Sequence, residues 1–224
     1  MDDDIIPWQK NYENGRFNVY PHDNIVSYVL RSFAAKGSLD RKEFTVLDLG
    51  IGGGNNFKFL VEEGFDAYGI DGSQKSISIV IERLGNALAP KLEIGNFVDL
   101  PYDSRMFDLV IDRQSIGHNR EEKLHQILNE VHRVLKFDGY LYSNVFGQRT
   151  SDLAYASRVK NNEYSEFSKG AFSNSHMLVA FTPELISTYL EAFDKVDISR
   201  SLVEKYSENS VVEEFFISAQ KCEK

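Results

Sequence analysis

The sequence is poor in cysteine and lacks long apolar runs. Its only cysteine, Cys222, lies near the carboxyl end, so no disulfide can form within the chain, which fits a reducing cytoplasm. Nowhere do about 18 apolar residues follow one another, as a membrane-spanning helix requires, so we expect no membrane partner. The start MDDDIIPWQK has no basic segment followed by an apolar core and does not resemble a secretory signal. We therefore expect a cytoplasmic protein.

An excess of basic charge is absent too. The formal net charge is −9 and no cluster of Lys or Arg stands out, so a nucleic-acid backbone would be repelled and is excluded as the expected partner. A chain of 224 residues, 42% hydrophobic and 26% charged, can bury a sizeable core and predicts a single domain over residues 1–224. We expect no metal, and the sequence leaves the oligomeric state open.

The most informative stretch is VLDLGIGGGNN at residues 46–56, an apolar strand that runs into a glycine turn. Glycine lacks a Cβ, so the chain can turn sharply with positive φ, and a ligand can approach the backbone. Asp48 precedes the turn, and Asp71 ends the next apolar run about 20 residues after the turn, where an acid accepts hydrogen bonds from ribose hydroxyls. Together these features predict a nucleotide-type cofactor site.

Helical and strand patterns alternate along the chain, which predicts an α/β fold with a mostly parallel sheet and helices on both faces. After an irregular start, the expected helices are residues 22–35, 54–63, a segment capped by Ser73, a long helix ended by Asp138 and Gly139, and one from Thr182 through Phe193. The expected strands are residues 44–49, a run ending at Asp71, 92–95, 107–112, 140–145, and a terminal antiparallel hairpin of 196–203 and 211–219.

Residues 146–181 form a polar stretch without clear periodicity, much longer than the usual connection of about 2 to 6 residues. Because this stretch starts at the carboxyl edge of the sheet, we predict that it is a substrate lid within the domain. Its basic and aromatic residues suit a polar or anionic small molecule. Residues 1–40 form the predicted cap segment and helix, in which Trp8, Tyr12, Phe17 and Tyr20 would supply the opposite wall.

Five motifs in order resemble the class I S-adenosylmethionine-dependent methyltransferases, from about Glu43 to the end. They are D-x-G-x-G-x-G from Asp48, GIDGS at 69–73, GNFVDLPY at 95–102, FDLVID at 107–112 and EVHRVLKFDGYLY at 130–142. The resemblance implies a Rossmann-like seven-stranded sheet with an antiparallel carboxyl-terminal hairpin. Two departures are Asn96, where an acid is common, and Phe137 with Asp138 in place of Pro-Gly.

The resemblance implies S-adenosylmethionine as cofactor and assigns its contacts. The implied cofactor-binding residues are Asp48, Gly50, Gly52, Gly54, Asp71, Gly72, Asn96, Phe97, Asp112 and Arg113. The glycine turn with Asp48 would hold the methionine end, Asp71 the ribose, and Asn96 with Phe97 the adenine. Structural roles are the alternatives: Asp48 satisfying N–H groups of the turn, Asn96 forming a turn, or Arg113 pairing with a surface acid.

Methyl transfer needs few catalytic groups because the sulfonium is already a good leaving group. If the acceptor is a hydroxyl, a base must take its proton, and His118 is the catalytic candidate by position and by its near-neutral reference pKa. The alternative is a loop histidine that caps the following helix.

We therefore expect transfer of a methyl group to a small polar metabolite by in-line displacement, on oxygen or nitrogen, with a sugar or carboxylic acid derivative as examples. One alternative is an NAD(P)-dependent oxidoreductase, but Asn55 occupies the last position of its G-x-G-x-x-G pattern. The other is a catalytically silent relative that binds the cofactor or a partner chain.

Overall fold

The computed structural model describes residues 5–34 and 40–223. The end of the predicted helix 22–35 and parts of the predicted cap segment 1–40 therefore lie outside the described residues. Within them, no helix is long and apolar enough to cross a membrane.

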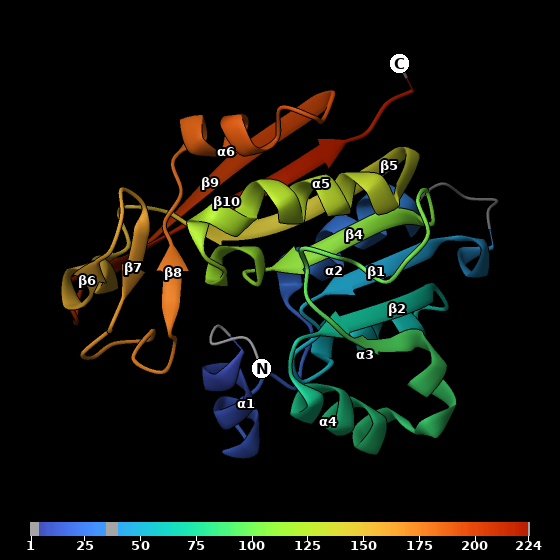
Figure 1. Cartoon of the computed structure of the whole chain (residues 1–224), viewed down its shortest axis with the longest axis horizontal. Coiled ribbons are helices and arrows are strands. Elements are labelled where there is room, and N and C mark those ends of the chain that lie inside the picture. Colours follow the sequence, from blue (N-terminus) through green and yellow to red (C-terminus); the bar gives the residue numbers. More distant parts are fainter. Residues whose placement is uncertain (1–4, 35–39, 224) are drawn as a thin grey trace.

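A seven-stranded sheet in the order β3-β2-β1-β4-β5-β10-β9 forms the centre of the molecule (Figure 1). Neighbouring strands are parallel from β3 to β5, and β10 runs antiparallel to both β5 and β9. The strands are β1 (Thr45–Leu49), β2 (Asp66–Asp71), β3 (Leu92–Ile94), β4 (Phe107–Arg113), β5 (Leu135–Phe146), β9 (Lys195–Lys205) and β10 (Ser210–Gln220). This arrangement confirms the predicted α/β fold with its antiparallel hairpin.

Helices cover both faces of the sheet. They are α1 (Ile6–Glu13), α2 (Asp23–Val29), α3 (Asn55–Glu62), α4 (Gln74–Leu84), α5 (Leu124–Val134) and α6 (Pro183–Tyr189). Because side chains alternate along a strand, Leu47 and Leu49 pack in the cluster with α5 and α6, whereas Val46 packs in the cluster with α2, α3 and α4. The predicted caps are present: the side chain of Ser73 accepts from the Ser76 N–H, and that of Thr182 from the Leu185 N–H.

Three boundaries differ from the sequence-based expectation. The start is not irregular, because Ile6–Glu13 form α1. The long helix ends at Val134 rather than near Asp138, and β5 begins at Leu135. The carbonyls of Arg133 and Val134 accept hydrogen bonds from the Arg105 and Met106 N–H groups, so the helix cannot continue through them. Likewise, α6 ends at Tyr189, four residues before Phe193.

The 146–181 segment forms a small unit of its own. It contains a 3₁₀ turn, Ser151–Tyr155, and a three-stranded sheet of β6 (Ser157–Arg158), β7 (Glu163–Ser165) and β8 (Met177–Val179). Leu153, Phe167 and Phe172 pack with Leu178 in a separate apolar cluster. The aromatic residues of this segment therefore largely bury one another.

Candidate functional site

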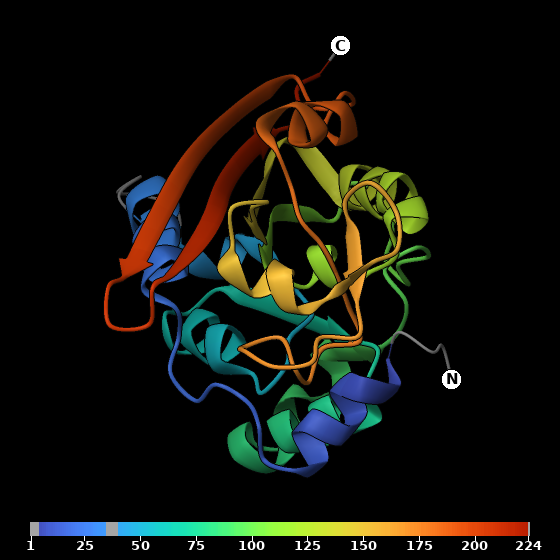
Figure 2. The same cartoon turned by 90° about the vertical axis from the view of Figure 1, so that its left-hand side faces the viewer.

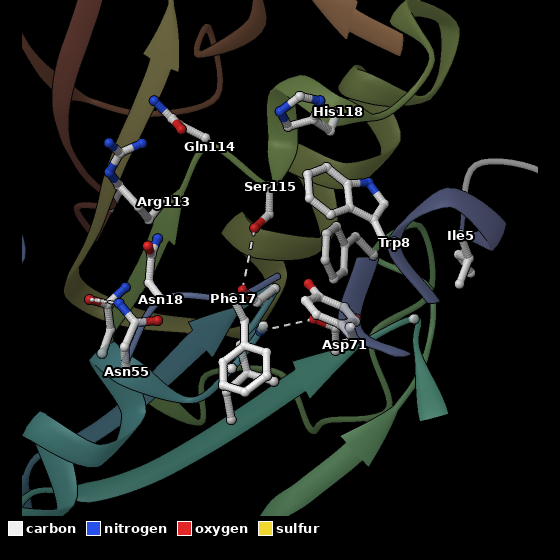
Figure 3. A pocket seen from close by; sticks show the side chains of 18 of the residues that line it. Ile5, Trp8, Phe17, Asn18, Asn55, Asp71, Arg113, Gln114, Ser115 and His118 are labelled. Atoms are coloured by element: carbon white, nitrogen blue, oxygen red, sulfur yellow. Dashed lines mark hydrogen bonds between the residues drawn. The ribbon is translucent and has the colours of Figure 1, made fainter. Parts of the chain in front are cut away.

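A cavity of about 330 Å³ lies where the parallel strands end at their carboxyl side. Its walls are the turn after β1, the ends of β2 and β4, the loop after β3, and α1 with the segment that follows it (Figure 3). The strand order reverses between β1 and β4, and ligands of open α/β sheets bind at such a switch point. The fold therefore places the cavity where a cofactor is expected.

The glycine turn forms the floor of this cavity. Gly50, Gly52 and Gly54 have φ values of +79°, +54° and +76°, as the sequence predicts for a sharp turn. The N–H groups of Gly50 and Ile51 both donate to the Ile70 carbonyl, at 2.9 and 3.0 Å, which ties the turn to β2. A Cβ at Gly50 would lie 2.0 Å from Ser115 Oγ. Gly54 is the N-cap of α3 and lies outside the cavity lining.

Asp71 lies at the end of β2 and lines the cavity, although only 6% of its surface is exposed. Its carboxylate accepts hydrogen bonds from the N–H groups of Gly52 at 3.0 Å and Ser73 at 2.9 Å. The hydroxyl of Tyr12 donates a further bond from α1. Burial raises the pKa of Asp71, and these bonds oppose the rise. The acid thus joins the glycine turn, α4 and α1.

Asp48 and Asp112 lie beneath the cavity and are not among its described lining residues. Asp48 accepts from the Phe57 N–H at the start of α3, while its Oδ2 has no hydrogen-bond partner among the described residues. Burial, and then the charge of Asp112, raise the pKa of Asp48 well above its usual range. Burial also raises the pKa of Asp112 to about 6. Asp48 therefore does not hold the turn through N–H groups of Gly50 or Gly52.

Asp112 shapes the loop after β4. Its Oδ1 accepts from the N–H groups of Ser115 and Ile116, at 2.8 and 3.1 Å, and its Oδ2 accepts from the Ser143 hydroxyl at 2.6 Å. Within this loop Gln114 adopts a φ of +69°, which is uncommon for a residue other than glycine. The carboxylate of Asp112 thus fixes the loop that carries Ser115 into the cavity wall, directly after Arg113 at the end of β4.

The adenine-side prediction falls on residues that line the cavity. Gly72, Asn96 and Phe97 all contribute to its wall. The Asn96 Oδ1 accepts from the Val98 N–H at 3.2 Å, so part of this side chain forms the turn that the alternative reading described. A Cβ at Gly72 would lie 2.7 Å from Ile5, because the start of α1 covers this glycine.

Arg113 and Gln114 lie on the opposite side of the cavity from Trp8 and Asp71 (Figure 3). The Arg113 guanidinium pairs with Glu214 on β10 at 3.2 Å, and Gln114 Nε2 donates to the same carboxylate at 2.7 Å. Burial lowers the pKa of Arg113. Arg113 therefore pairs with an acid while it also lines the cavity, but Glu214 is mostly buried and is not the surface acid of the structural alternative.

His118 lines the cavity and ends a 3₁₀ turn, Ile116–His118. Its Nδ1 lies 2.7 Å from the Met177 carbonyl oxygen, which can only accept, so Nδ1 carries the proton and Nε2 is the unprotonated nitrogen. Trp8 packs edge-on against the ring, with centroids 4.9 Å apart. Burial lowers the pKa of His118 to about 4, so the ring is neutral near pH 7.

Of the aromatic residues predicted as the opposite wall, Trp8, Tyr12 and Phe17 line the cavity. Tyr20 is 84% exposed and lies outside it. No described residue of 146–181 lines this cavity; the segment meets it through Met177 and Phe172, which contact His118. Sequence reasoning missed Ser115, and it missed that Ile5, Trp8 and Tyr12 share one face of a helix, a spacing that the sequence shows.

Comparison with known proteins agrees with this geometry. The methyltransferase domain family matches residues 47–143. An uncharacterized methyltransferase from Alkaliphilus oremlandii is 27% identical over 140 residues, which are 59% of this chain and 61% of that protein. The chain thus matches about three fifths of that relative's length.

Residues 47–143 thus resemble a methyltransferase domain, and the chain has the fold of solved S-adenosylmethionine-dependent methyltransferases.

Solved structures confirm the methyltransferase fold. An S-adenosylmethionine-dependent methyltransferase from Methanosarcina mazei superposes with a TM-score of 0.67 at 20% identity, over 80% of this chain and 93% of that one. The Burkholderia thailandensis 1,6-didemethyltoxoflavin-N1-methyltransferase, with bound 1,6-didemethyltoxoflavin and S-adenosylhomocysteine, has a TM-score of 0.61 at 18% identity, over 96% and 85% of the two chains. At these identities the likeness concerns the fold alone.

The glycine turn allows a first test. Gly50→Ala should lower the free energy of unfolding by about 2 kcal/mol or more, because a left-handed φ and the contact with Ser115 both oppose the new Cβ. Gly64→Ala is the matched control: its φ is +86°, but nothing lies within 4 Å of the added Cβ, so only about 1 kcal/mol should be lost. Urea unfolding measures both. Equal losses would show that packing at Gly50 does not matter.

Proposed function

We propose that the protein transfers a methyl group from S-adenosylmethionine to a small polar metabolite, on oxygen or nitrogen. The observation that carries this proposal is the buried Asp71 carboxylate facing a cavity whose floor is the Cβ-free turn. A sugar or carboxylic acid derivative suits the polar wall of Asn18, His22, Asn55 and Arg113. The Burkholderia neighbour, whose bound acceptor is a small molecule, supports the substrate class.

The residues present fit the cofactor. The cavity of about 330 Å³ falls within the usual range of small-ligand sites, and a Cβ at Gly50 would fill its floor. Gly50 and Gly52 would hold the methionyl end, Asp71 the ribose, and Gly72, Asn96 and Phe97 the adenine. Arg113 would close the methionyl side, while Asp48 and Asp112 act from beneath by holding α3 and the β4 loop in place. When bound, the cofactor supplies an activated methyl group.

The chain's own residues then bind and orient the acceptor and exclude water. His118 is the proposed base for an acceptor that must lose a proton. The Met177 carbonyl and Trp8 hold its ring so that Nε2 keeps its lone pair. We further propose the domain organisation expected from the sequence: one domain, with residues 1–40 as a cap and 146–181 as the substrate-side lid.

Cofactor binding is tested by calorimetric titration with S-adenosylhomocysteine and, separately, NADH. We expect binding of S-adenosylhomocysteine and none of NADH; the reverse result would overturn the methyltransferase proposal in favour of an oxidoreductase. Transfer of labelled methyl to an acceptor in a metabolite screen excludes the silent alternative.

Binding of S-adenosylmethionine should release protons near pH 6. Three buried carboxyl groups, Asp48, Asp71 and Asp112, lie at this end of the sheet with raised pKa values, that of Asp112 being about 6. A cationic ligand favours their ionised forms and lowers these pKa values, so protons leave when it binds. Calorimetry in buffers of different ionisation enthalpy counts them. S-adenosylhomocysteine, which lacks the sulfonium charge, should release fewer, and equal release by both ligands would contradict the electrostatic argument.

Substitution His118→Ala should lower turnover by roughly 10²-fold to 10⁴-fold, the usual effect of a lost general base, while S-adenosylhomocysteine affinity changes little. Because the pKa of His118 is about 4, protonation of its ring should lower turnover only near pH 4. Above about pH 5 the part of the turnover that depends on His118 should not change with pH. The control is His132→Ala, since His132 lies on α5 against Phe193 and is not among the described residues that line the cavity. Unchanged turnover of the His118 variant across pH would rule out its role as base.

A further inference from the structure

A second cavity of about 330 Å³ lies on the neighbouring face of α1, against the strand-connecting segment 173–176. Its described lining residues are Pro7, Lys10, Asn11, Asn14, Arg16, Ser173, Asn174, Ser175 and His176, none of which is acidic. Three of them, Lys10, Arg16 and His176, carry or can carry positive charge. In a chain of net charge −9, this is a local reversal of sign.

Helix geometry explains why the two cavities adjoin. Ile5, Trp8 and Tyr12 recur at spacings of three and four residues and face the first cavity. The second cavity is lined by residues with the same spacing on the neighbouring face of the helix, namely Pro7, Lys10 and Asn14. Arg16, just beyond the helix, lines both cavities.

The wall of the second cavity formed by residues 173–176 lies next in sequence to Met177, which contacts His118. Asn11 Nδ2 donates to the Asn174 carbonyl at 3.1 Å, which joins α1 to the segment before β8; Figure 2 shows this orange segment reaching α1. His176 immediately precedes Met177, whose carbonyl holds Nδ1 of His118. His176, which lines the second cavity, is therefore adjacent in sequence to the residue that orients His118. A small molecule with one group in the second cavity would lie close to His118.

The cations of this cavity are available to a ligand. Two lysines of the 146–181 segment are engaged elsewhere: Lys160 pairs with Glu122 at 3.0 Å, and the Lys169 ammonium lies 4.1 Å from the centre of the Tyr155 ring. Lys10, Arg16 and His176 are exposed and form no ion pair within residues 5–34 and 40–223. Unpaired cations that converge in a cleft favour an anion there.

We propose that this second cavity binds the anionic group of the methyl acceptor, a carboxylate or a phosphate, through Lys10, Arg16 and His176. The acceptor is then a small organic acid or phosphate ester whose nucleophilic atom reaches the first cavity beside His118. This inference rests on the proposed function for its reaction, but the anion site itself is tested without turnover.

The test follows the imidazole proton signals of the five histidines by NMR while inorganic phosphate or, separately, acetate is added at constant ionic strength. Both the free protein and the protein saturated with S-adenosylhomocysteine are titrated. We expect a saturable shift of the His176 signal, assigned with His176→Asn, while the His132 signal, on the opposite helix layer against Phe193, stays constant. Tighter binding of phosphate or of acetate tells which anion the site prefers.

Lys10→Ala and Arg16→Ala should each weaken anion binding about tenfold, the value of one charge-assisted hydrogen bond. Lys205→Ala, an exposed lysine on the distant β9–β10 hairpin, is the matched control and should leave it unchanged. Equal anion affinity in all these proteins, or equal shifts of every histidine, overturns the proposal. So does a loss of S-adenosylhomocysteine affinity in Lys10→Ala, which would assign the cavity to the cofactor's own carboxylate. Failure of the unaltered protein to bind S-adenosylhomocysteine refutes the proposed function instead, while the titration of the free protein still decides the anion site.

Discussion

The arrangement of the site depends on one buried carboxylate, that of Asp71. It accepts hydrogen bonds from the turn after β1, from the first residues before α4, and from Tyr12 on α1. These segments are far apart in the sequence. Further bonds support the junction, because Gln9 on α1 accepts from Ser73 and Lys75, and the Ser76 hydroxyl donates to the Gly52 carbonyl. Because a buried acceptor must be satisfied, the acid fixes their relative positions. The cavity is the space that this convergence leaves open.

Burial has a second effect at the same end of the sheet. Asp48, Asp71 and Asp112 each have a raised pKa, and burial is the first cause in every case. The charge of Asp112 also raises the pKa of Asp48, since like charges close together oppose ionisation. The fold thus gathers three carboxyl groups whose ionisation burial opposes, and a cationic ligand at this edge of the sheet would favour their charged forms.

Much of the fold could be predicted because local signals and packing agree. The apolar runs before Leu49, Asp71 and Asp112 are strands buried on both faces, and Ser73 and Thr182 cap helices through their own side chains. The end of α5 could not be predicted, because it is set by distant partners, Arg105 and Met106, that take its last carbonyls.

The site could be predicted from the sequence where the type of a residue determines its role. It was less predictable where the role depends on which residues pack around it. Glycines at positive φ and an acid at a strand end are readable from the sequence. That Asp48 and Asp112 lie beneath the cavity, and that Asn96 shares its side chain with a turn, depends on packing that no spacing reveals. The strands of the 146–181 segment are two or three residues long, too short for an alternating pattern to appear.

The contact between Tyr12 and Asp71 also bears on binding thermodynamics. The described hydrogen bonds of Asp71 come from Gly52, Ser73, Ser76 and Tyr12, which leaves few free acceptor positions on its two oxygens. A ligand hydroxyl that bonds to this carboxylate would therefore compete with the Tyr12 phenol, the donor that comes from α1. Such competition would couple occupancy of the cavity to the position of the amino-terminal helix.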